Sequence, residues 1–158
     1  MNPPQAAREA EAAVAAWLYA QPDLPADRAE GGWLTVLPGE NRRNLPVFIE
    51  VGEQTTTFQA FFMAAPDERQ AELYAYLLRR HARSYLARFA LDASGDVLLV
   101  AVLPVGAVTV EELDRVLGQM LQLADDTYLE ALRLGFATYI EREQAWRERV
   151  GLGRNPIS

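Results

Sequence analysis

The 158-residue chain contains no cysteine, and other side chains that perform covalent chemistry are scarce. Without cysteine it can form no disulfide, no thiolate nucleophile and no thiolate zinc site. It has one histidine, His81, and three serines, Ser84, Ser94 and Ser158. These absences exclude several classes of catalytic site before any motif is considered.

Long apolar runs are also missing. No stretch approaches the roughly 20 consecutive apolar residues that a membrane-spanning helix needs. Residues 1–5 carry no basic segment followed by an apolar run, so they do not resemble a signal peptide. We therefore expect a cytoplasmic protein.

Positive charge is in the minority. The chain has 15 basic residues, all arginine, against 22 acidic ones, which gives a net charge of −7. Repulsion from phosphate disfavours direct binding to nucleic acid or to anionic membrane surfaces. An acidic surface instead suggests a protein partner that has basic regions, such as a nucleic-acid-binding protein.

Hydrophobic periodicity predicts an α+β fold in the order α-βββ-α-ββ-α, an antiparallel sheet with helices packed on it. Half of the residues are apolar, which suits one domain over residues 1–158 with its core at about 33–128. A loop is expected over residues 21–32. The expected helices cover residues 3–20, 66–81 and a segment from 110; the expected strands cover 33–37, 46–51, 55–64, 85–91 and 97–103.

The last helix has the clearest start. Thr109 followed by Glu112 fits a capping box, and Val108 and Leu113 are spaced to form a hydrophobic staple. The helical pattern continues past Gly135, a possible break, into a C-terminal helical extension over residues 133–150. In the helix at 66–81, Asp67 and Glu68 are expected in the first turn and arginines at the end, as the helix dipole favours.

Three segments resemble the YbjN-like family: the hairpin Asp92-Ala93-Ser94-Gly95-Asp96-Val97-Leu98-Leu99, the strand end Leu103-Pro104, and the capped helix start from Val108 to Leu113. The match covers roughly residues 33–128. The resemblance implies a type III secretion chaperone-like fold, usually a homodimer, with no known catalytic residues or cofactor. It also implies a link to regulation and stress responses, and the related chaperones hold extended segments of client proteins. The stretch from Arg79 to Arg83 and the tail from Arg133 depart from the pattern.

The candidates for chemistry all have simpler explanations. His81 and Ser84 could form a catalytic pair, but no serine lies in a strand–turn–helix elbow. Asp125, Asp126 and Glu130 could serve a metal or small-molecule sensor only with help from other segments. The glycine pairs at 31–32 and 151–153 lack the spacing of a phosphate-binding loop. We therefore predict no enzyme, no cofactor and no metal site.

A basic cluster is the best nucleic-acid candidate. Arg79, Arg80, Arg83 and Arg88 lie close in sequence, with Tyr85 and Phe89 among them. Arginine and aromatic side chains together can bind single strands. Docking of an acidic protein segment on the same patch is an equal alternative.

The strands are apolar on both sides, unlike a sheet that faces water on one side. Either helices cover both faces, or a second subunit or bound segment covers one of them. We favour the second interpretation and predict a homodimeric, non-enzymatic, chaperone-like protein-binding module. The predicted apolar interface residues are Phe58, Phe61, Phe62, Met63, Val100 and Val102.

Overall fold

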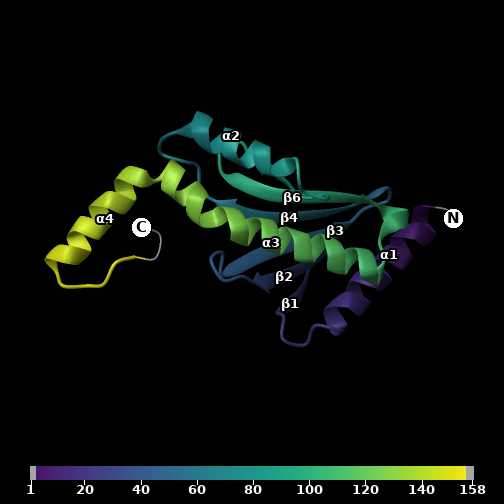
Figure 1. Ribbon diagram of the computed structural model, residues 1–158. Helices are drawn as coiled ribbons and strands as arrows, with labels where there is room; N and C mark the ends of the chain where they lie inside the picture. The colour runs from purple at the N-terminus through teal and green to yellow at the C-terminus, as the bar shows by residue number, and fades with distance from the viewer. Residues whose placement is uncertain (1–2, 156–158) are drawn as a thin grey trace.

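A computed structural model describes residues 3–155, which form one antiparallel sheet and a layer of helices (Figure 1). The order along the chain is α1 (Pro3–Tyr19), β1 (Ala26–Ala29), β2 (Gly32–Pro38), β3 (Asn44–Val51), β4 (Thr55–Met63), α2 (Gln70–His81), β5 (Arg88–Leu91), β6 (Val97–Pro104), the 3-10 turn η1 (Val105–Ala107), α3 (Val110–Gly135) and α4 (Ala137–Arg149).

The sheet has six strands in the order β1-β2-β3-β4-β6-β5. The predicted meander is present as β2, β3 and β4, and the predicted hairpin is β5 with β6. Strand β6 pairs with β4, so β5 forms one edge of the sheet and β1 the other.

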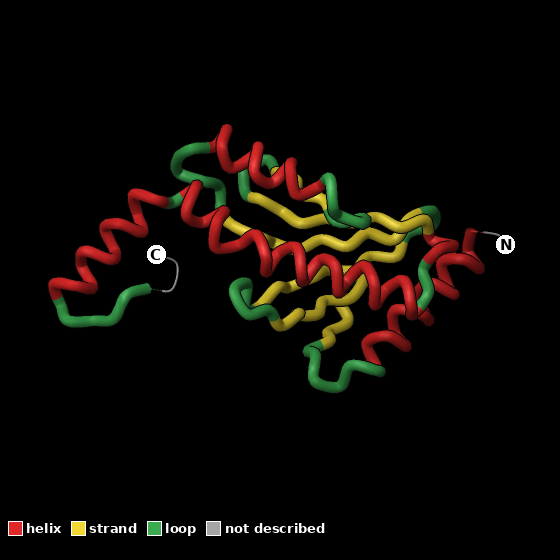
Figure 2. Tube along the Cα trace, viewed as in Figure 1, coloured by secondary structure: helices red, strands yellow, loops and turns green. Residues whose placement is uncertain are grey.

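The helices α1, α2 and α3 cover one face of the sheet, and within residues 3–155 no helix lies over the other face (Figure 2). Helix α3 lies across the strands, with α1 and α2 packed on either side of it. Under α3, alternate strand residues such as Val47, Ile49 and Leu99 are fully buried. The alternative in which helices cover both faces is therefore wrong.

Two predicted elements begin later than expected, and their first residues bond elsewhere. Helix α2 starts at Gln70, because Arg69 before it has a left-handed backbone (φ 52°) that a right-handed helix cannot include; the N–H groups of Asp67 and Glu68 donate instead to the carbonyl of Gly135. Strand β5 starts at Arg88, since the N–H groups of Leu86 and Ala87 donate to the side chain of Gln119 on α3.

Strand β1 was not predicted, because its sequence carries no apolar alternation. All four residues of β1 are exposed, so this edge strand is held by backbone pairing to β2. Within the expected loop at 21–32, residues 26–29 are therefore strand, and residue 32 already begins β2.

Helix α3 begins as its sequence predicts. Thr109 is extended, and its hydroxyl accepts a hydrogen bond from the N–H of Glu112 at 3.1 Å. The reciprocal half of the capping box is replaced, because the Glu112 carboxylate accepts from the Tyr85 hydroxyl and pairs with Arg115. Val108 and Leu113 are both buried, as a staple requires.

The predicted break at Gly135 is present: α3 ends there, and α4 begins at Ala137 in a new direction. The Glu68 carboxylate accepts from the N–H of Thr138 at 2.7 Å and from its hydroxyl at 3.1 Å, which caps the start of α4. Helix α4 then projects from the body (Figure 1). The segment after α4 folds back on it, as Gln144 exchanges hydrogen bonds with the backbone of Asn155.

Two glycines of α3 predict opposite responses to alanine. A Cβ at Gly135 would lie 2.9 Å from the Cβ of Pro66, whereas a Cβ at Gly118 would meet nothing within 4 Å. Gly135→Ala should lower the free energy of unfolding by about 1–3 kcal/mol through overpacking. Gly118→Ala should raise it by about 0.5–1 kcal/mol through helix propensity. Urea unfolding of both variants tests this, and stabilisation by Gly135→Ala would contradict the packed corner.

Candidate functional site

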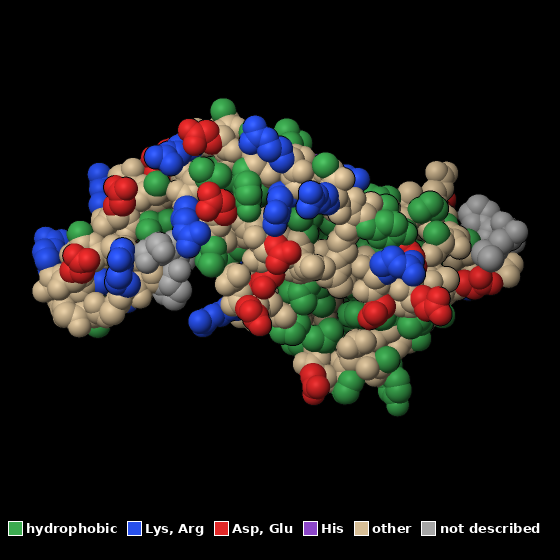
Figure 3. Space-filling view, in the orientation of Figure 1, with side chains coloured by type: hydrophobic (Ala, Val, Ile, Leu, Met, Phe, Trp, Pro, Cys, Tyr) green, Lys and Arg blue, Asp and Glu red, His purple; other side chains and the backbone are tan. Residues whose placement is uncertain are grey.

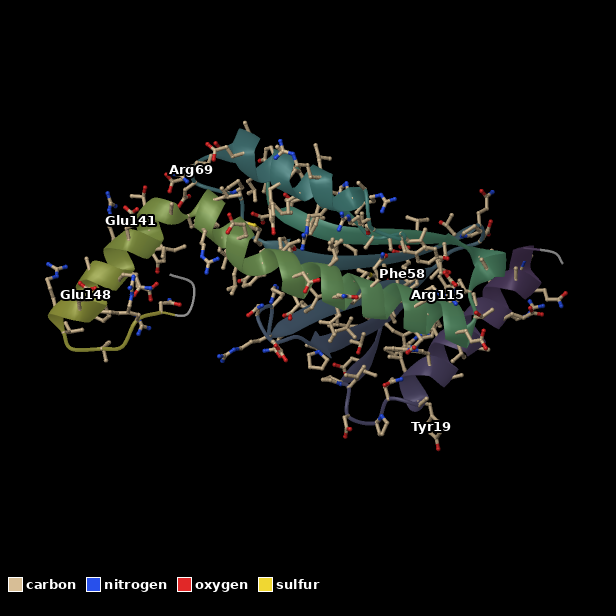
Figure 4. All side chains as sticks on the ribbon, in the orientation of Figure 1. Tyr19, Phe58, Arg69, Arg115, Glu141 and Glu148 are labelled. Atoms are coloured by element: carbon tan, nitrogen blue, oxygen red, sulfur yellow. The ribbon has the colours of Figure 1, made fainter. Side chains whose placement is uncertain are left out.

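The six predicted interface residues separate onto the two faces of the sheet. Phe58 and Phe62 are fully buried, and Phe58 lies between α3 and the sheet (Figure 4). Val100 is half-buried on the uncovered face, where Phe61 and Val102 are 43% and 50% exposed. Only these last three can offer apolar surface to another molecule.

Strict alternation along β4 would place Met63 on the same face as Phe61, but Met63 lies in the core. The register between β4 and β6 shifts between Phe61 and Met63, so Met63 pairs with the buried Val97. This bulge turns Met63 into the core, where it is 2% exposed, instead of alongside Phe61.

The uncovered face, here named the open face, mixes apolar and polar side chains. Exposed Leu34, Phe61 and Val102 stand among half-buried apolar residues. One row of paired residues crosses all six strands in sheet order: Asp27, Leu34, Phe48, Gln59, Val100 and Arg88. The row carries an acid at one end and a base at the other, with three apolar residues and Gln59 between them.

A second apolar surface lies between α2 and the edge strand β5. A groove of about 280 Å³ is lined by Leu77, Leu78, Phe89, Leu91 and their neighbours. Leu78 is 64% exposed and Leu91 50% exposed at its rim. The lining is apolar apart from His81 and the Tyr74 hydroxyl, which distinguishes this groove from the mixed open face.

The third surface is a cleft of about 620 Å³ between α2 and α3, here named the basic cleft. Arg79, Arg80 and Arg83 line its α2 side, and basic side chains gather between α2 and the middle of α3 in Figure 3. Arg88 is not part of it. Its side chain donates to the carbonyls of Ser84 and Ala87, and its backbone pairs with Val100 on the open face.

His81 and Ser84 do not form a catalytic pair. The Nε2 of His81 accepts a hydrogen bond from the N–H of Phe89 at 2.9 Å, and its ring stacks on Phe89. The Ser84 hydroxyl donates to the carbonyl of Ala87 at 2.6 Å. Each side chain thus fixes a backbone group near the edge strand. Burial lowers the pKa of His81 below its ordinary 6.5, and the nearby Arg88 charge lowers it further.

The carboxylates of α3 are also divided. Asp125 accepts hydrogen bonds from the N–H groups of Asn41 and Arg42, at 2.6 and 2.9 Å, and so holds the β2–β3 turn on the helix. Asp126 is exposed, and Glu130 pairs with Arg133 at 3.6 Å. Within residues 3–155, no three potential metal-ligating side chains gather into a site.

The turn that Asp125 holds contains an arginine that sequence reasoning missed. The Arg42 guanidinium donates to the carbonyls of Phe61, Phe62 and Asn44 at 2.7–3.1 Å and lies over the Tyr128 ring. It satisfies the backbone at the bulged end of β4. No local pattern indicates this role, since two of the three carbonyls that Arg42 binds belong to β4, about twenty residues along the chain.

Comparison with known proteins identifies the family. The model of the YbjN family, described as "putative bacterial sensory transduction regulator", matches residues 12–133. The chain belongs to the YbjN family. It is 40% identical over 111 residues to uncharacterized protein Rv0487 of Mycobacterium tuberculosis, covering 70% of this chain and 61% of that protein. It is 36% identical over 121 residues to ML2442 of Mycobacterium leprae, covering 77% and 66%.

Solved structures show the same fold at low identity. YbjN of E. coli, described as a putative transcription regulator, aligns with a TM-score of 0.54 at 21% identity over 75% of this chain and 87% of that one. A chain of the heterodimeric ExoU–SpcU complex from the type III secretion system of Pseudomonas aeruginosa aligns with a TM-score of 0.51 at 17% identity, over 77% and 97%. The predicted type III secretion chaperone-like α+β fold is confirmed.

The YbjN match includes most of the residues of all three surfaces and ends just before α4. Helix α4 therefore extends this chain beyond the family pattern, as predicted for residues after 133. None of the helices within residues 3–155 combines the length and apolar character needed to cross a membrane.

Asp125 and Asp126 allow a matched test of the α3 contact with the β2–β3 turn. Asp125→Ala should lower the free energy of unfolding by about 1–3 kcal/mol, because two backbone donors lose their acceptor. Asp126→Ala should change it by less than about 0.5 kcal/mol, as expected for an exposed surface side chain. Thermal or urea unfolding measures both, and equal effects of the two variants would contradict a role for Asp125 in holding the turn.

His81 predicts a pH dependence of stability. Its pKa is lower in the folded than in the unfolded chain, so the unfolded state binds a proton first as pH falls. The contribution of His81 is complete above its ordinary pKa. It decreases as pH falls from there to the folded pKa, and then stays constant.

His81→Gln keeps a side-chain acceptor but does not titrate. Urea unfolding between pH 7.5 and 5.5 should show a smaller loss of stability for this variant than for wild type, since the carboxylates contribute equally to both. Identical pH profiles would show that His81 titrates in the same way folded and unfolded.

Proposed function

We propose that this YbjN-family chain is a homodimeric, chaperone-like module that binds other proteins without catalysis. The observation that carries the proposal is the open face, a six-stranded sheet surface with exposed Leu34, Phe61 and Val102 and no helix over it. Contiguous exposed apolar surface on a folded chain marks an interaction site. The fold shared with a chain of a heterodimeric secretion-system complex supports a protein partner.

The groove between α2 and β5 suits a second copy of the chain. Permanent subunit interfaces are more apolar than transient ones, and this groove is almost wholly apolar. It is also self-complementary, because the protruding Leu78 stands beside a groove of side-chain size. A two-fold axis at this edge would place each Leu78 in the groove of the other subunit.

Addition of a strand to β5 is a weaker alternative for the same edge. An added strand would need the outward backbone groups of β5, but the N–H of Phe89 is already bound to His81 Nε2. The groove therefore favours side-chain packing of α2 and β5 against their copies. It leaves the open face accessible for a different occupant.

The open face suits an extended client segment. Its apolar positions are interrupted by Gln59, Thr57 and Glu50, which resembles the polar mixture of non-permanent interfaces. Phe61, Val100 and Val102 are the predicted residues that remain available there. The net charge of −7 favours clients with basic regions through long-range attraction. A regulatory setting is in keeping with the description of the YbjN family.

Light scattering combined with size exclusion tests the dimer and its location. Wild type should have about twice the 17.6 kDa chain mass. Leu78→Glu should give the single-chain mass, because two carboxylates would be buried in an apolar interface. Phe61→Glu should remain dimeric. A monomeric wild type would contradict the dimer, and a monomeric Phe61→Glu with a dimeric Leu78→Glu would reverse the two surfaces.

The same variants test client binding. Reduced insulin is a suitable aggregating probe, because dithiothreitol has no disulfide to act on in this cysteine-free chain. Wild type should suppress insulin aggregation, and Phe61→Glu with Val102→Glu should suppress it less. Trp146→Glu on α4 is the control, since Trp146 and Val102 are each 50% exposed. Equal protection by all three proteins would contradict a client site on the open face.

A further inference from the structure

We propose that the basic cleft binds a short, extended, acidic segment of a partner protein; this rests on the proposed protein-binding function and adds the chemistry of one recognition element. The cleft is a surface separate from the open face and from the groove at the β5 edge. Its volume of about 620 Å³ falls within the range of ligand-binding sites in proteins.

The charges of the cleft carry the inference. The chain has more acidic than basic residues, 22 against 15, so most arginines could be neutralised internally. Among the residues that the structure describes, Arg28, Arg115, Arg133 and Arg147 make ion pairs, and Arg79, Arg80 and Arg83 are among the arginines that make none. The Arg80 guanidinium lies over the ring of Tyr76 and not against a carboxylate. Three guanidinium groups thus face one cleft with their pairing capacity unused.

The helix dipole accounts for only part of this arrangement. Basic side chains in the last turn of α2 stabilise its C-terminal end, as the sequence predicts. Arg83, however, lies beyond that helix and also lines the cleft. Stabilisation of the last turn of α2 therefore does not explain why Arg83 lines the cleft.

The rest of the cleft also offers donors. The Gln119 Oε1 atom accepts the N–H groups of Leu86 and Ala87, which fixes the amide and leaves its Nε2 as a donor. Burial raises the pKa of Tyr76, so its hydroxyl keeps its proton at neutral pH. Gln122 adds a second exposed amide. A surface of this kind needs acceptors, and arginine forks fit carboxylates with two parallel hydrogen bonds.

One end of the cleft is acidic, which sets a direction. Tyr76 experiences the charges of Asp126 and Glu130, so these carboxylates lie at the Tyr76 end. Gln119 and Arg83 lie at the other end, near the segment that follows α2. The bound segment would place its carboxylates along Arg79, Arg80 and Arg83 and a neutral or basic residue at Asp126.

A nucleic-acid strand fits the cleft less well. Among the residues that line the cleft, Tyr76 is the only aromatic one. Arg80 already lies over its ring, so this ring is not free to stack with a base. Arg88, the fourth member of the cluster in sequence, belongs to the open face. Because every nucleotide carries a phosphate, a strand would place one against Asp126, whereas a peptide segment can place a neutral or basic residue there.

Fluorescence anisotropy with defined probes tests the cleft. The probes are a fluorescein-labelled ten-residue peptide alternating glutamate and serine, the same peptide with glutamine for glutamate, and a ten-nucleotide oligo-dT strand. Wild type should bind the acidic peptide best, with an affinity that falls as salt is raised. The double variant Arg79→Glu, Arg83→Glu should weaken this binding by about tenfold or more. The matched control Arg142→Glu, Arg149→Glu on α4 changes the net charge equally and should bind as wild type does.

Three results would overturn the proposal: equal binding of the glutamate and glutamine peptides, unchanged binding by the cleft variant, or tighter binding of oligo-dT than of the acidic peptide. Light scattering and insulin protection separate this proposal from the proposed function. If wild type and the cleft variant are both dimeric and both protect insulin, but wild type does not bind the acidic peptide, only the role proposed for the basic cleft is contradicted. Loss of the dimer and of insulin protection in wild type removes the proposed function itself.

Discussion

Helix α3 lies across one face of the sheet, and the position of every other helix follows from it. Its buried stripe includes Leu113, Val116, Leu117 and Met120, each worth about 1.5–3 kcal/mol when removed from water. Helices α1 and α2 pack against its two sides, so the helical layer is complete with three members. Helix α4 turns away at the Gly135 corner and does not reach the opposite face. Within residues 3–155 the sheet thus has one face covered by helices and one open face.

The placement of α2 beside α3 also creates two grooves with opposite chemistry. On the α3 side, the long polar side chains of α2 form the basic cleft, with Arg79 and Arg83 on its wall. On the β5 side, the apolar stripe of α2 continues past the core into the groove that ends at Leu78. A single short helix therefore separates a charged surface from an apolar one. Under the two proposals, a second copy of the chain and an acidic segment would bind on opposite sides of this helix without competing.

The fold was predictable where local signals agree with the final packing. Alternation in β3 marks Val47 and Ile49 as core residues, and Thr109 marks the start of α3 through a cap that needs only neighbouring residues. The missed features depend on distant partners. Strand β1 exists through pairing with β2, and Glu68, which lies before the left-handed Arg69, bonds to Thr138 of α4 seventy residues away.

The candidate site shows the same limit more sharply. Sequence periodicity places Phe58 and Phe61 on opposite faces but cannot say which face the helices take. Closeness in sequence also fails to predict which residues share a surface. Arg83 and Arg88 are five positions apart, yet the pleat of β5 turns Arg88 to the open face while Arg83 lines the cleft. Of the four arginines that the sequence groups together, Arg79, Arg80 and Arg83 share the basic cleft. These three arginines make no ion pair within residues 3–155 and converge on one concave surface, and this convergence supports an anion supplied by another molecule.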